Sequence, residues 1–501
     1  MNNQYILAID LGTSGPKVAI VSTSGNVLDC EIESNSVYTL PGGGAEQNPD
    51  EWWAAIKKAV KRLLAKQLVA VDEIVAISCT AQWSGTVAVD EQGNHVMNAI
   101  IWMDARGTPH VRQITSSAFK IEGYGVDKLW SWLRRTGGIP TRSGKDPIAH
   151  ILYIKNEHPD IYRQTYKFLE PKDYLNLRLT GRFAASYDSI TLHWVTDNRD
   201  INHITYDDKL LKLATLDREK LPELKSAVDI LGPIKPEVAH ELGVNPGIPV
   251  VMGTPDLHSA TIGSGAVQDY AAHLYIGTSS WLSCHVPYKK TDLFHNMASL
   301  PSAIPGRYFI VNEQESAGAC LVFLRDNILY HEDELARDDR RPDVYQAFDR
   351  IVEKTPAGSN KLIFMPWLNG ERTPIDDHTV RGGFFNLSIS HNREHMIRAV
   401  FEGVAYNSRW LLKYVEQFVK RPFPAINIIG GGANSNVWCQ IHADVMNRTI
   451  RQVKDPIQAN VRGAALLAAV ALGKTTFDAI SDHIQIAHVY EPNPANRAMY
   501  D

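Results

Sequence analysis

The sequence predicts an α/β protein made of two domains of like fold. Its 501 residues exceed the ~250 to 300 residues that one hydrophobic core usually holds. A strand, a Gly-Thr-Ser tip and a second strand occur around Gly12-Thr13-Ser14, and the pattern returns 265 positions later at Gly277-Thr278-Ser279. A repeat separated by about half the chain indicates a duplicated domain. We therefore expect one domain at residues 1–250 and another at residues 251–501.

Composition excludes several classes of partner. A net charge of -5 and a pI near 6.4 give no reason to expect a nucleic acid or a membrane surface as a partner. The five cysteines include no C-x-x-C pair, so neither a disulfide framework nor a zinc site is indicated. The start of the chain lacks signal-peptide features, and the longest apolar run, residues 464–472, is too short to span a bilayer. We expect a cytoplasmic protein.

The two hairpin tips are candidate phosphate loops. Residues 5–9 and 17–21 are apolar and read as strands on either side of the first tip. Glycine, threonine and serine present backbone N–H groups and hydroxyls without bulky side chains, which is what a polyphosphate requires. A single such hairpin would be an ordinary tight turn. Its recurrence favours two loops that face one shared cleft.

Two further strands in the first half are followed by polar and aromatic side chains. Residues 74–79 lead to Gln82, Trp83 and Ser84, and residues 99–102 lead through Trp102 to Asp104 and Arg106. Ligands of α/β sheets bind outside the carboxyl ends of strands, so we interpret these groups as sugar contacts. The alternative for each tryptophan is core packing. Helices are expected after Asn48-Pro49 and from Pro171 to Thr180, and both serve as scaffold.

Asp256 is the candidate catalytic acid of the second half. It lies between an expected buried strand, residues 248–252, and a helix start flanked by glycines. From the residues alone, Asp256 either faces the cleft or caps the helix that follows. A triple glycine, residues 430–432, joins a strand to the helix at 437–446 and brings backbone close to a ligand. Gly473-Lys474-Thr475 is not a P-loop, because Ala468 stands where the first glycine of that motif is needed. The sequence also lacks the motifs of the protein kinases.

Taken together, these motifs resemble those of the FGGY carbohydrate kinases between Ile6 and about Leu472. The matching stretches are residues 10–14, Gln82, Trp102-x-Asp104-x-Arg106, residues 171–174, Asp256, residues 277–279, 318–319, 324–326, 370–374, 402–404 and 430–432. The resemblance implies two ribonuclease H-like (actin-like ATPase) domains with an active-site cleft between them. It also implies ATP and Mg²⁺ as cofactors, and a small-molecule sugar as substrate.

The resemblance assigns a role to each motif. Asp256 is the implied catalytic base and Asp10 the implied metal-binding carboxylate. The implied sugar contacts are Gln82, Trp83, Ser84, Trp102, Asp104 and Asp256. The implied ATP contacts are Gly12, Thr13, Ser14, Lys17, Gly277, Thr278, Gly318, Gly431, Gly432 and Asn436. Phosphoryl transfer consists largely of positioning and charge neutralisation, which such a set can supply.

The sugar itself is less closely defined. In xylulose kinases the glutamine is typically followed by Met-His and in glycerol kinases by Arg-Glu, but here Trp83-Ser84 follow Gln82. Leu257 stands where pentulose kinases commonly have asparagine. Chain length and the region around Trp102 are closer to xylulose kinases, so a ketopentose such as xylulose is the first expectation. Gluconate, ribulose, erythritol or glycerol, a non-catalytic sugar-binding relative, a chaperone or cytoskeletal ATPase, and a homodimer are left open.

Overall fold

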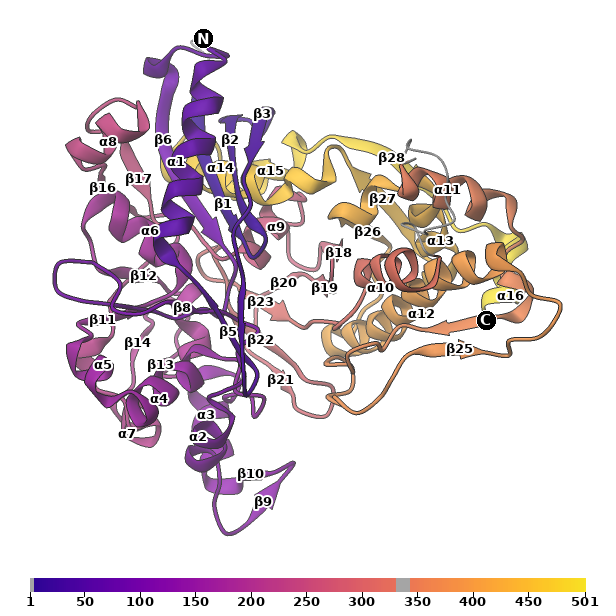
Figure 1. Ribbon diagram of the computed structural model, residues 1–501, viewed down its shortest axis with the longest axis horizontal. Helices are drawn as coiled ribbons and strands as arrows, with labels where there is room; N and C mark the ends of the chain where they lie inside the picture. The colour runs from indigo at the N-terminus through magenta and orange to yellow at the C-terminus, as the bar shows by residue number, and fades with distance from the viewer. Residues whose placement is uncertain (1–3, 330–342) are drawn as a thin grey trace.

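The computed structural model describes residues 4–329 and 343–501 (Figure 1). Its first half contains a six-stranded sheet in the order β16-β17-β6-β1-β2-β3. The strands are β1 (Tyr5–Gly12), β2 (Gly15–Ser22), β3 (Val27–Ile32), β6 (Ile74–Ala81), β16 (Ile230–Pro233) and β17 (Pro249–Val251). The strands expected at residues 5–9, 17–21, 74–79 and 248–252 are thereby confirmed.

The second half contains a five-stranded sheet in the order β19-β18-β26-β27-β28. In both sheets an antiparallel hairpin is followed by two parallel neighbours and then by one antiparallel edge strand. The predicted duplication is therefore confirmed, and only β3 lacks a counterpart in the second sheet. The strands are β18 (Ala272–Ile276), β19 (Ser280–Ser283), β26 (Ala425–Ile429), β27 (Thr449–Val453) and β28 (Ile486–Tyr490).

Two helices form a layer between the sheets, α9 (Asp256–Gly263) and α14 (Ala459–Ala471) (Figure 1). One side of this layer packs on β1 and β2 through Ile6, Ala8 and their neighbours. The other side packs on Trp281 and Ile429 of the second sheet. Both halves of the duplication therefore share these two helices.

The two helices cross in close contact because glycine stands at the crossing point on each. A Cβ atom on Gly263 would lie 1.8 Å from the carbonyl oxygen of Ala459, and one on Gly463 would lie 1.8 Å from that of Ser259. The Ser259 hydroxyl also donates to the Asn460 carbonyl at 2.8 Å. No other residue type would allow the two backbones to approach this closely.

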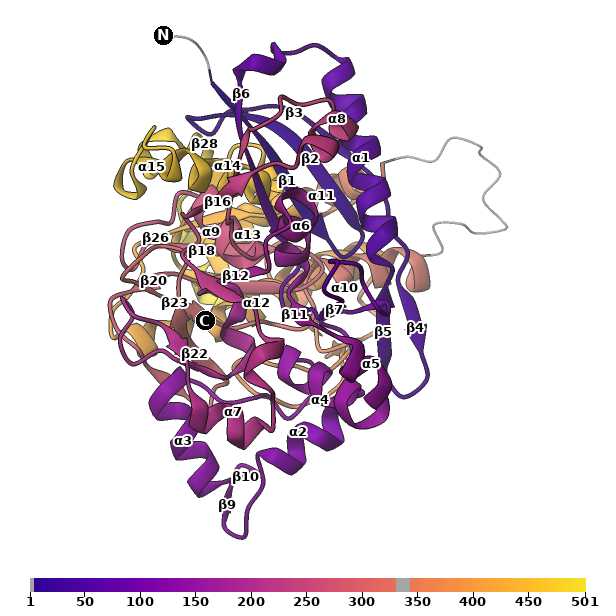
Figure 2. The ribbon, with the colours of Figure 1, turned by 90° about the vertical axis from the view of Figure 1, so that its left-hand side faces the viewer.

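The opposite face of the first sheet is covered by α1 (Pro49–Ala65), α6 (Pro171–Thr180) and α8 (Pro236–Leu242). Figure 2 shows α1 and α8 on one side of β1, β2 and β6, with α14 on the other. Because alternate strand residues point to opposite faces, Leu7 and Ile9 pack under these helices while Ile6 and Ala8 face α14. The Asn48 side chain accepts from the Asp50 backbone at 2.9 Å, which confirms the expected helix start.

The outer face of the second sheet packs against a long helix and its neighbours. These are α10 (Gly318–Phe323), α11 (Val344–Lys354), α12 (Arg393–Val419), α13 (Asn436–Met446) and α16 (Arg497–Tyr500), while α15 (Phe477–His483) packs beside α14. A helical subdomain of the first half comprises α2 (Thr108–Ile114), α3 (Val126–Thr136), α4 (Pro147–Glu157), α5 (Pro159–Gln164) and α7 (Asp208–Ala214).

Smaller sheets complete the fold. The four-stranded one contains β20 (His285–Val286), β21 (Thr291–Asp292), β22 (Met297–Pro301) and β23 (Tyr308–Val311). The two-stranded ones pair β7 (Val87–Val89) with β11 (Lys167–Leu169), β9 (Lys120–Ile121) with β10 (Tyr124–Gly125), β12 (Ala184–Ser186) with β15 (Glu223–Lys225), β13 (Thr196–Asp197) with β14 (Thr205–Tyr206), and β24 (Ile363–Met365) with β25 (Gly383–Phe385).

The strand expected at residues 99–102 differs from the prediction. It is only β8 (Ala99–Ile100), which joins a separate three-stranded sheet with β4 (Tyr38–Leu40) and β5 (Gly44–Gln47). The chain turns directly after it, because the Asp104 backbone N–H bonds back to the Ile101 carbonyl at 2.9 Å. Gln82 therefore follows a strand of the main sheet, as expected, whereas Trp102 and Asp104 follow a strand of a separate sheet.

Across residues 4–329 and 343–501, no helix combines the length and the apolar character needed to cross a bilayer. The boundary near residue 250 stays a prediction. The chain enters the shared layer at α9, directly after β17, and returns to it at α14.

The helix crossing makes a testable prediction about stability. We expect Gly463→Ala to lower the free energy of unfolding by about 3 kcal/mol, because the added methyl group forces the two backbones apart. Chemical denaturation followed by circular dichroism measures the change. Gly383→Ala is the matched control, since its methyl group would meet only Met365 Cε at 3.8 Å. Equal stability of the two variants would contradict the crossing as described.

Candidate active site

Asp10 and Asp256 come together where the two halves meet. Asp10 lies near the end of β1 and is 1% exposed, and Asp256 is the first residue of α9. Burial, and then the negative charge of Asp10, raise the pKa of Asp256 to about 8. The N-cap position belongs to Pro255, so Asp256 is not the cap; its Oδ1 accepts from the adjacent Leu257 N–H at 2.9 Å.

The segment before Asp256 has a backbone that only glycine adopts easily. Gly253 has φ +72°, and a Cβ there would lie 2.1 Å from the Cys79 carbonyl oxygen of β6. The next residue, Thr254, donates its hydroxyl to the buried carboxylate of Asp188. These two contacts fix the direction in which the chain enters α9.

A buried polar cluster on α6 supports the same segment from below. The Lys172 ammonium donates to the Met252 carbonyl at 3.1 Å, and the Asn176 amide donates to the same oxygen at 2.7 Å. Lys172 also forms an ion pair with Asp173, whose other oxygen accepts from Ser189 at 2.7 Å. The stretch at residues 171–174 is thus scaffold, as its sequence indicated, and it positions the approach to Asp256.

Asp10 makes only long polar contacts with the described residues around it. Lys17 Nζ lies 3.4 Å from one carboxylate oxygen, and the Asn460 amide lies 3.5 Å from the other. Asp10 raises the pKa of Lys17, while the uncompensated repulsion between Asp10 and Asp256 remains. One buried carboxylate with only long contacts suits Mg²⁺, which usually keeps several waters and binds one or two protein carboxylates together with substrate phosphates. Among the described residues, no group of three or more His, Cys, Asp or Glu forms a protein-only metal cage.

The second hairpin tip packs directly against the start of α10. Gly318 N–H donates to the Gly277 carbonyl, and Ala317 N–H donates to the Thr278 carbonyl, both at 2.8 Å. A Cβ on Gly318 would lie 2.5 Å from the Gly277 oxygen. Gly277, Thr278 and Gly318, predicted separately as ATP contacts, therefore form one unit. The exposed tips carry Ser14 in the first half and Thr278 in the second.

The triple glycine contributes in two different ways. A Cβ on Gly432 would lie 2.4 Å from Ile276 Cγ2, so this glycine allows the turn to pack on β18. Gly431 is exposed and has no atom within 4 Å of such a Cβ. Asn436 begins α13, and its side-chain oxygen accepts from Tyr490 Oη at 2.9 Å and from Gln452 Nε2 at 3.1 Å. Gly431 and Asn436 are the members of this group that face solvent.

A hydrogen-bond chain connects the first hairpin tip to the predicted sugar contacts. Trp102 Nε1 donates to Thr13 Oγ1 at 2.9 Å, and this hydroxyl donates to Gln82 Oε1 at 2.9 Å. Gln82 Nε2 donates to Gln47 Oε1 at 2.7 Å, and Gln47 Nε2 donates to the Thr13 carbonyl at 2.8 Å. Sequence reasoning missed Gln47, because nothing in the short stretch around it distinguishes it from an ordinary polar residue.

The other predicted sugar contacts are enclosed by protein. Asp104 is 1% exposed, and its carboxylate accepts from Arg106 Nε and from the Ala45 N–H, each at 2.9 Å. Trp83 is buried, and its indole N–H donates to the Ser189 carbonyl at 3.0 Å. Ser84 Oγ donates to the Lys145 carbonyl at 2.8 Å. Their contact with a sugar stays a prediction, while their present bonds shape the walls around Trp102.

A loop of the second half reaches the same region. Arg372 lies with its guanidinium 5.5 Å from the centre of the Trp102 ring, and it pairs with both Glu313 and Glu315. Buried Glu371 fixes this loop by accepting from the Arg372 and Glu315 N–H groups, each at 2.9 Å.

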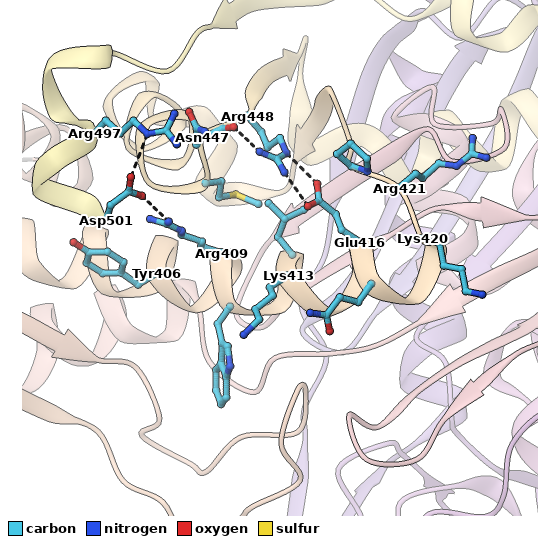
Figure 3. Close-up of a pocket in the computed structure, with 15 residues that line it drawn as sticks. Tyr406, Arg409, Lys413, Glu416, Lys420, Arg421, Asn447, Arg448, Arg497 and Asp501 are labelled. Atoms are coloured by element: carbon cyan, nitrogen blue, oxygen red, sulfur yellow. Dashed lines mark hydrogen bonds and ion pairs between the residues drawn. The ribbon is translucent and has the colours of Figure 1, made fainter.

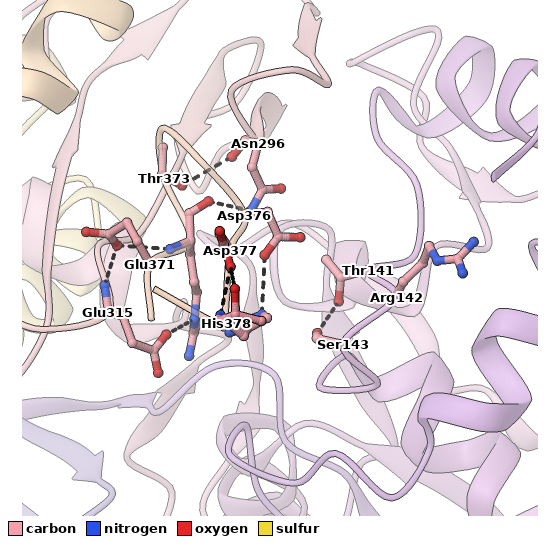
Figure 4. A network of polar contacts seen from close by, with 12 residues as sticks. Thr141, Arg142, Ser143, Asn296, Glu315, Glu371, Thr373, Asp376, Asp377 and His378 are labelled. Atoms are coloured by element: carbon pink, nitrogen blue, oxygen red, sulfur yellow. Dashed lines mark hydrogen bonds and ion pairs between the residues drawn. The ribbon is translucent and has the colours of Figure 1, made fainter. Parts of the chain in front are cut away.

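Figure 4 shows Glu315 and Glu371 on one side and Thr141, Arg142 and Ser143 of the first half on the other. The resemblance covered the Arg372 stretch without assigning it a role; a Gly-Glu-Arg-Thr sequence carries no ligand signature by itself.

A pocket of about 790 Å³ lies away from this site, on the outer surface of α12 (Figure 3). Arg448 pairs there with Glu416 at 2.8 Å, and Arg409 pairs with Asp501 at 2.7 Å. None of the predicted site residues lines it. This pocket is therefore separate from the predicted site.

Comparison with known proteins gives this arrangement a family. Residues 5–263 match the N-terminal domain of the FGGY family of carbohydrate kinases, and residues 272–472 match its C-terminal domain. The chain belongs to this family. It is a sugar phosphotransferase that uses ATP, and the predicted fold of two ribonuclease H-like, actin-like ATPase domains is confirmed.

The individual FGGY relatives are named for two different substrates, xylulose and gluconate. A xylulose kinase of Staphylococcus epidermidis is 29% identical over 506 residues, covering 100% of this chain and 95% of the relative. A gluconokinase of Bacillus licheniformis is 28% identical over 497 residues, covering 99% and 93%. The solved gluconate kinase and the ligand-bound xylulose kinase of Lactobacillus acidophilus each superpose with a TM-score of 0.85 at 26% identity, covering 99% of this chain and 95% of theirs.

The raised pKa of Asp256 predicts a pH-dependent cost to folding. Because its folded pKa of about 8 exceeds the ordinary aspartate value of 3.8, the folded protein holds one extra proton between these pH values. Stability is therefore lost as pH rises through this window. We expect Asp256→Asn to match the parent near pH 4 and to be more stable by roughly 1 to 3 kcal/mol at pH 8.

Denaturation midpoints measured without nucleotide at several pH values check this difference. Asp482→Asn, at an exposed position, is the control and should show no comparable trend. A difference in denaturation midpoint between the Asp256→Asn protein and the parent that stays constant with pH would contradict the proposed charge environment.

Proposed function

We propose that the protein transfers the γ-phosphoryl group of ATP to a hydroxyl of a small sugar, with Asp256 as the general base. The single observation that supports this role most is the pair Asp256 and Asp10. One carboxyl has a pKa of about 8, and its partner lies buried beside a candidate phosphate loop. A base with a pKa close to the working pH is well matched to accepting a proton from an attacking hydroxyl.

The hairpin tips would hold the phosphates. Gly12 and Thr13 in the first half and Gly277 and Thr278 in the second offer backbone N–H groups, which stabilise charge that develops during transfer. Lys17 adds a positive charge next to Asp10. Asp10 would hold Mg²⁺, which supplies charge neutralisation on the phosphates when bound. Gly431 and Asn436 are the proposed adenosine side of the nucleotide site.

The sugar would lie between Asp256 and Trp102. A ketopentose is the first candidate, because xylulose kinases are among the relatives that span the chain. A sugar acid is the second, because gluconokinases match over a similar length. A non-catalytic relative is disfavoured, since Asp10 and Asp256 are both present and the charge of Asp10 acts on the pKa of Asp256.

The cysteines fit a reducing compartment. All five are free, and four of them are buried. Cytosolic proteins rarely carry disulfides, so we infer a cytoplasmic location. A homodimer stays a prediction.

ATP consumption coupled to a panel of neutral and acidic sugars tests the proposed function. We expect turnover only when a sugar is present, and we expect Asp256→Ala to reduce kcat by about 10² to 10⁴, because the hydroxyl loses its base. Asp482→Ala serves as the control and should retain full activity. ATP hydrolysis independent of any sugar, or equal turnover by the Asp256→Ala protein, would contradict the proposal.

A further inference from the structure

Gln47, the last residue of β5, has its whole side-chain amide engaged inside the protein, where it is fully buried. Its Nε2 donates to the Thr13 carbonyl at 2.8 Å and to the Ser36 carbonyl at 3.2 Å. Its Oε1 accepts from Gln82 Nε2 at 2.7 Å and from the Trp52 indole N–H at 3.2 Å. An amide has two N–H donors and two oxygen lone pairs, so this one has no capacity left for a ligand.

The Trp52 indole determines the direction of the hydrogen bonds around Gln47. An indole N–H only donates and a backbone carbonyl only accepts, so the Gln47 oxygen faces Trp52 and its NH₂ group faces the two carbonyls. Gln82 then presents its NH₂ group to the Gln47 oxygen, and its own oxygen receives the Thr13 hydroxyl at 2.9 Å. Thr13 therefore offers a phosphate its backbone and not its hydroxyl proton.

The bond from Gln47 to the Thr13 carbonyl also sets the direction of the next backbone N–H. The peptide between Thr13 and Ser14 is trans, and in a trans peptide the C=O and the N–H point in opposite directions. Because the carbonyl points to buried Gln47, the Ser14 N–H points to the exposed side of the tip. It donates to no other backbone group among the described residues.

The segment that supports the tip is held by the same amide. The Asn35 N–H donates to the Ser14 carbonyl at 3.0 Å, so the peptide on the other side of Ser14 is fixed as well. Ser36, which follows Asn35, provides the second carbonyl that Gln47 holds. Gln47 therefore restrains the hairpin tip directly and also through the segment that packs beside it.

We propose that Gln47 is a positioning residue for phosphoryl transfer, which aims the Ser14 N–H at the phosphates of ATP and fixes the orientation of the Gln82 amide. This inference rests on the proposed kinase function and adds a residue that touches neither substrate. A backbone donor that is held in place before ATP binds needs no reorganisation when charge develops on the phosphoryl group. Loss of the Gln47 amide would weaken contacts to phosphate and leave contacts to adenosine unchanged.

Nucleotide binding to a neutral variant tests this role without turnover. Gln47→Met has a side chain of similar length and no hydrogen-bonding N–H, and it adds no charge that would repel a phosphate. Calorimetry with Mg²⁺ and AMP-PNP, a non-hydrolysable ATP analogue, should show affinity about 10- to 100-fold weaker than that of the parent, because one hydrogen bond to a charged group is lost. Adenosine, which has no phosphate, should bind both proteins equally.

Trp52→Phe is the matched control for stability. It removes the indole donor to the same Gln47 oxygen and leaves the bonds to Thr13 and Gln82 in place. Both variants should unfold at lower denaturant concentration than the parent, but Trp52→Phe should keep the parent affinity for AMP-PNP. Gln113→Met, at an exposed position on α2, should change neither quantity.

Gln47→Asn is the second variant if Gln47→Met does not fold. It keeps an amide in the core but is one carbon shorter, so it cannot keep all four bonds. The same loss of AMP-PNP affinity is expected, with adenosine again unaffected.

Three results would overturn the inference. The first is AMP-PNP binding by the Gln47 variants that equals binding by the parent. The second is an equal loss of affinity for adenosine and AMP-PNP, which would indicate general damage to the site. The third is a loss of AMP-PNP affinity in Trp52→Phe as large as that in Gln47→Met. A parent protein that binds no AMP-PNP would contradict the proposed kinase function itself, and the inference would fail with it.

Discussion

The close crossing of α9 and α14 is the constraint on which the rest of the molecule depends. Gly263 and Gly463 allow two backbones to touch, and this contact brings together the helix that begins at Asp256 and the helix whose first turn holds Asn460. Asn460 is also the residue that approaches Asp10 from the second half. The distance between the two acids is thus set by packing far from either carboxylate.

Keeping two acids close together opposes folding, and the structure offsets that cost locally. Lys172 and Asn176 hold the carbonyl of Met252, and Gly253 lets the chain pass close to the Cys79 carbonyl of β6. These buried hydrogen bonds restrain the segment before Asp256. Preorganisation of this kind keeps the base near neutral pKa before any substrate arrives.

The sequence identified features whose signals are local and failed where contacts are distant. Strand periodicity, the recurring Gly-Thr-Ser tip and the glycines around Asp256 each describe their own surroundings, so the duplicated sheets and the central acid were predictable. Gln47 and Arg372 lie in stretches without a distinctive pattern, and tertiary contacts alone bring them to Thr13 and Trp102. The early end of β8 is not predictable for the same reason. The turn after it depends on the hydrogen bond from the Asp104 N–H to the Ile101 carbonyl, which hydrophobic periodicity does not indicate.

The hydroxyl of Thr13 has a consequence for how the two substrates communicate. It accepts from Trp102 and donates to Gln82, so a single O–H group connects the proposed nucleotide loop to the proposed sugar contacts. A sugar that reorients either side chain would also reorient the loop that carries Thr13 and thereby change the affinity for ATP. Thermodynamic linkage then requires ATP to change the affinity for the sugar by the same factor. If Thr13 holds phosphate as proposed, this hydroxyl would couple sugar occupancy to the phosphate loop and so limit ATP hydrolysis without an acceptor.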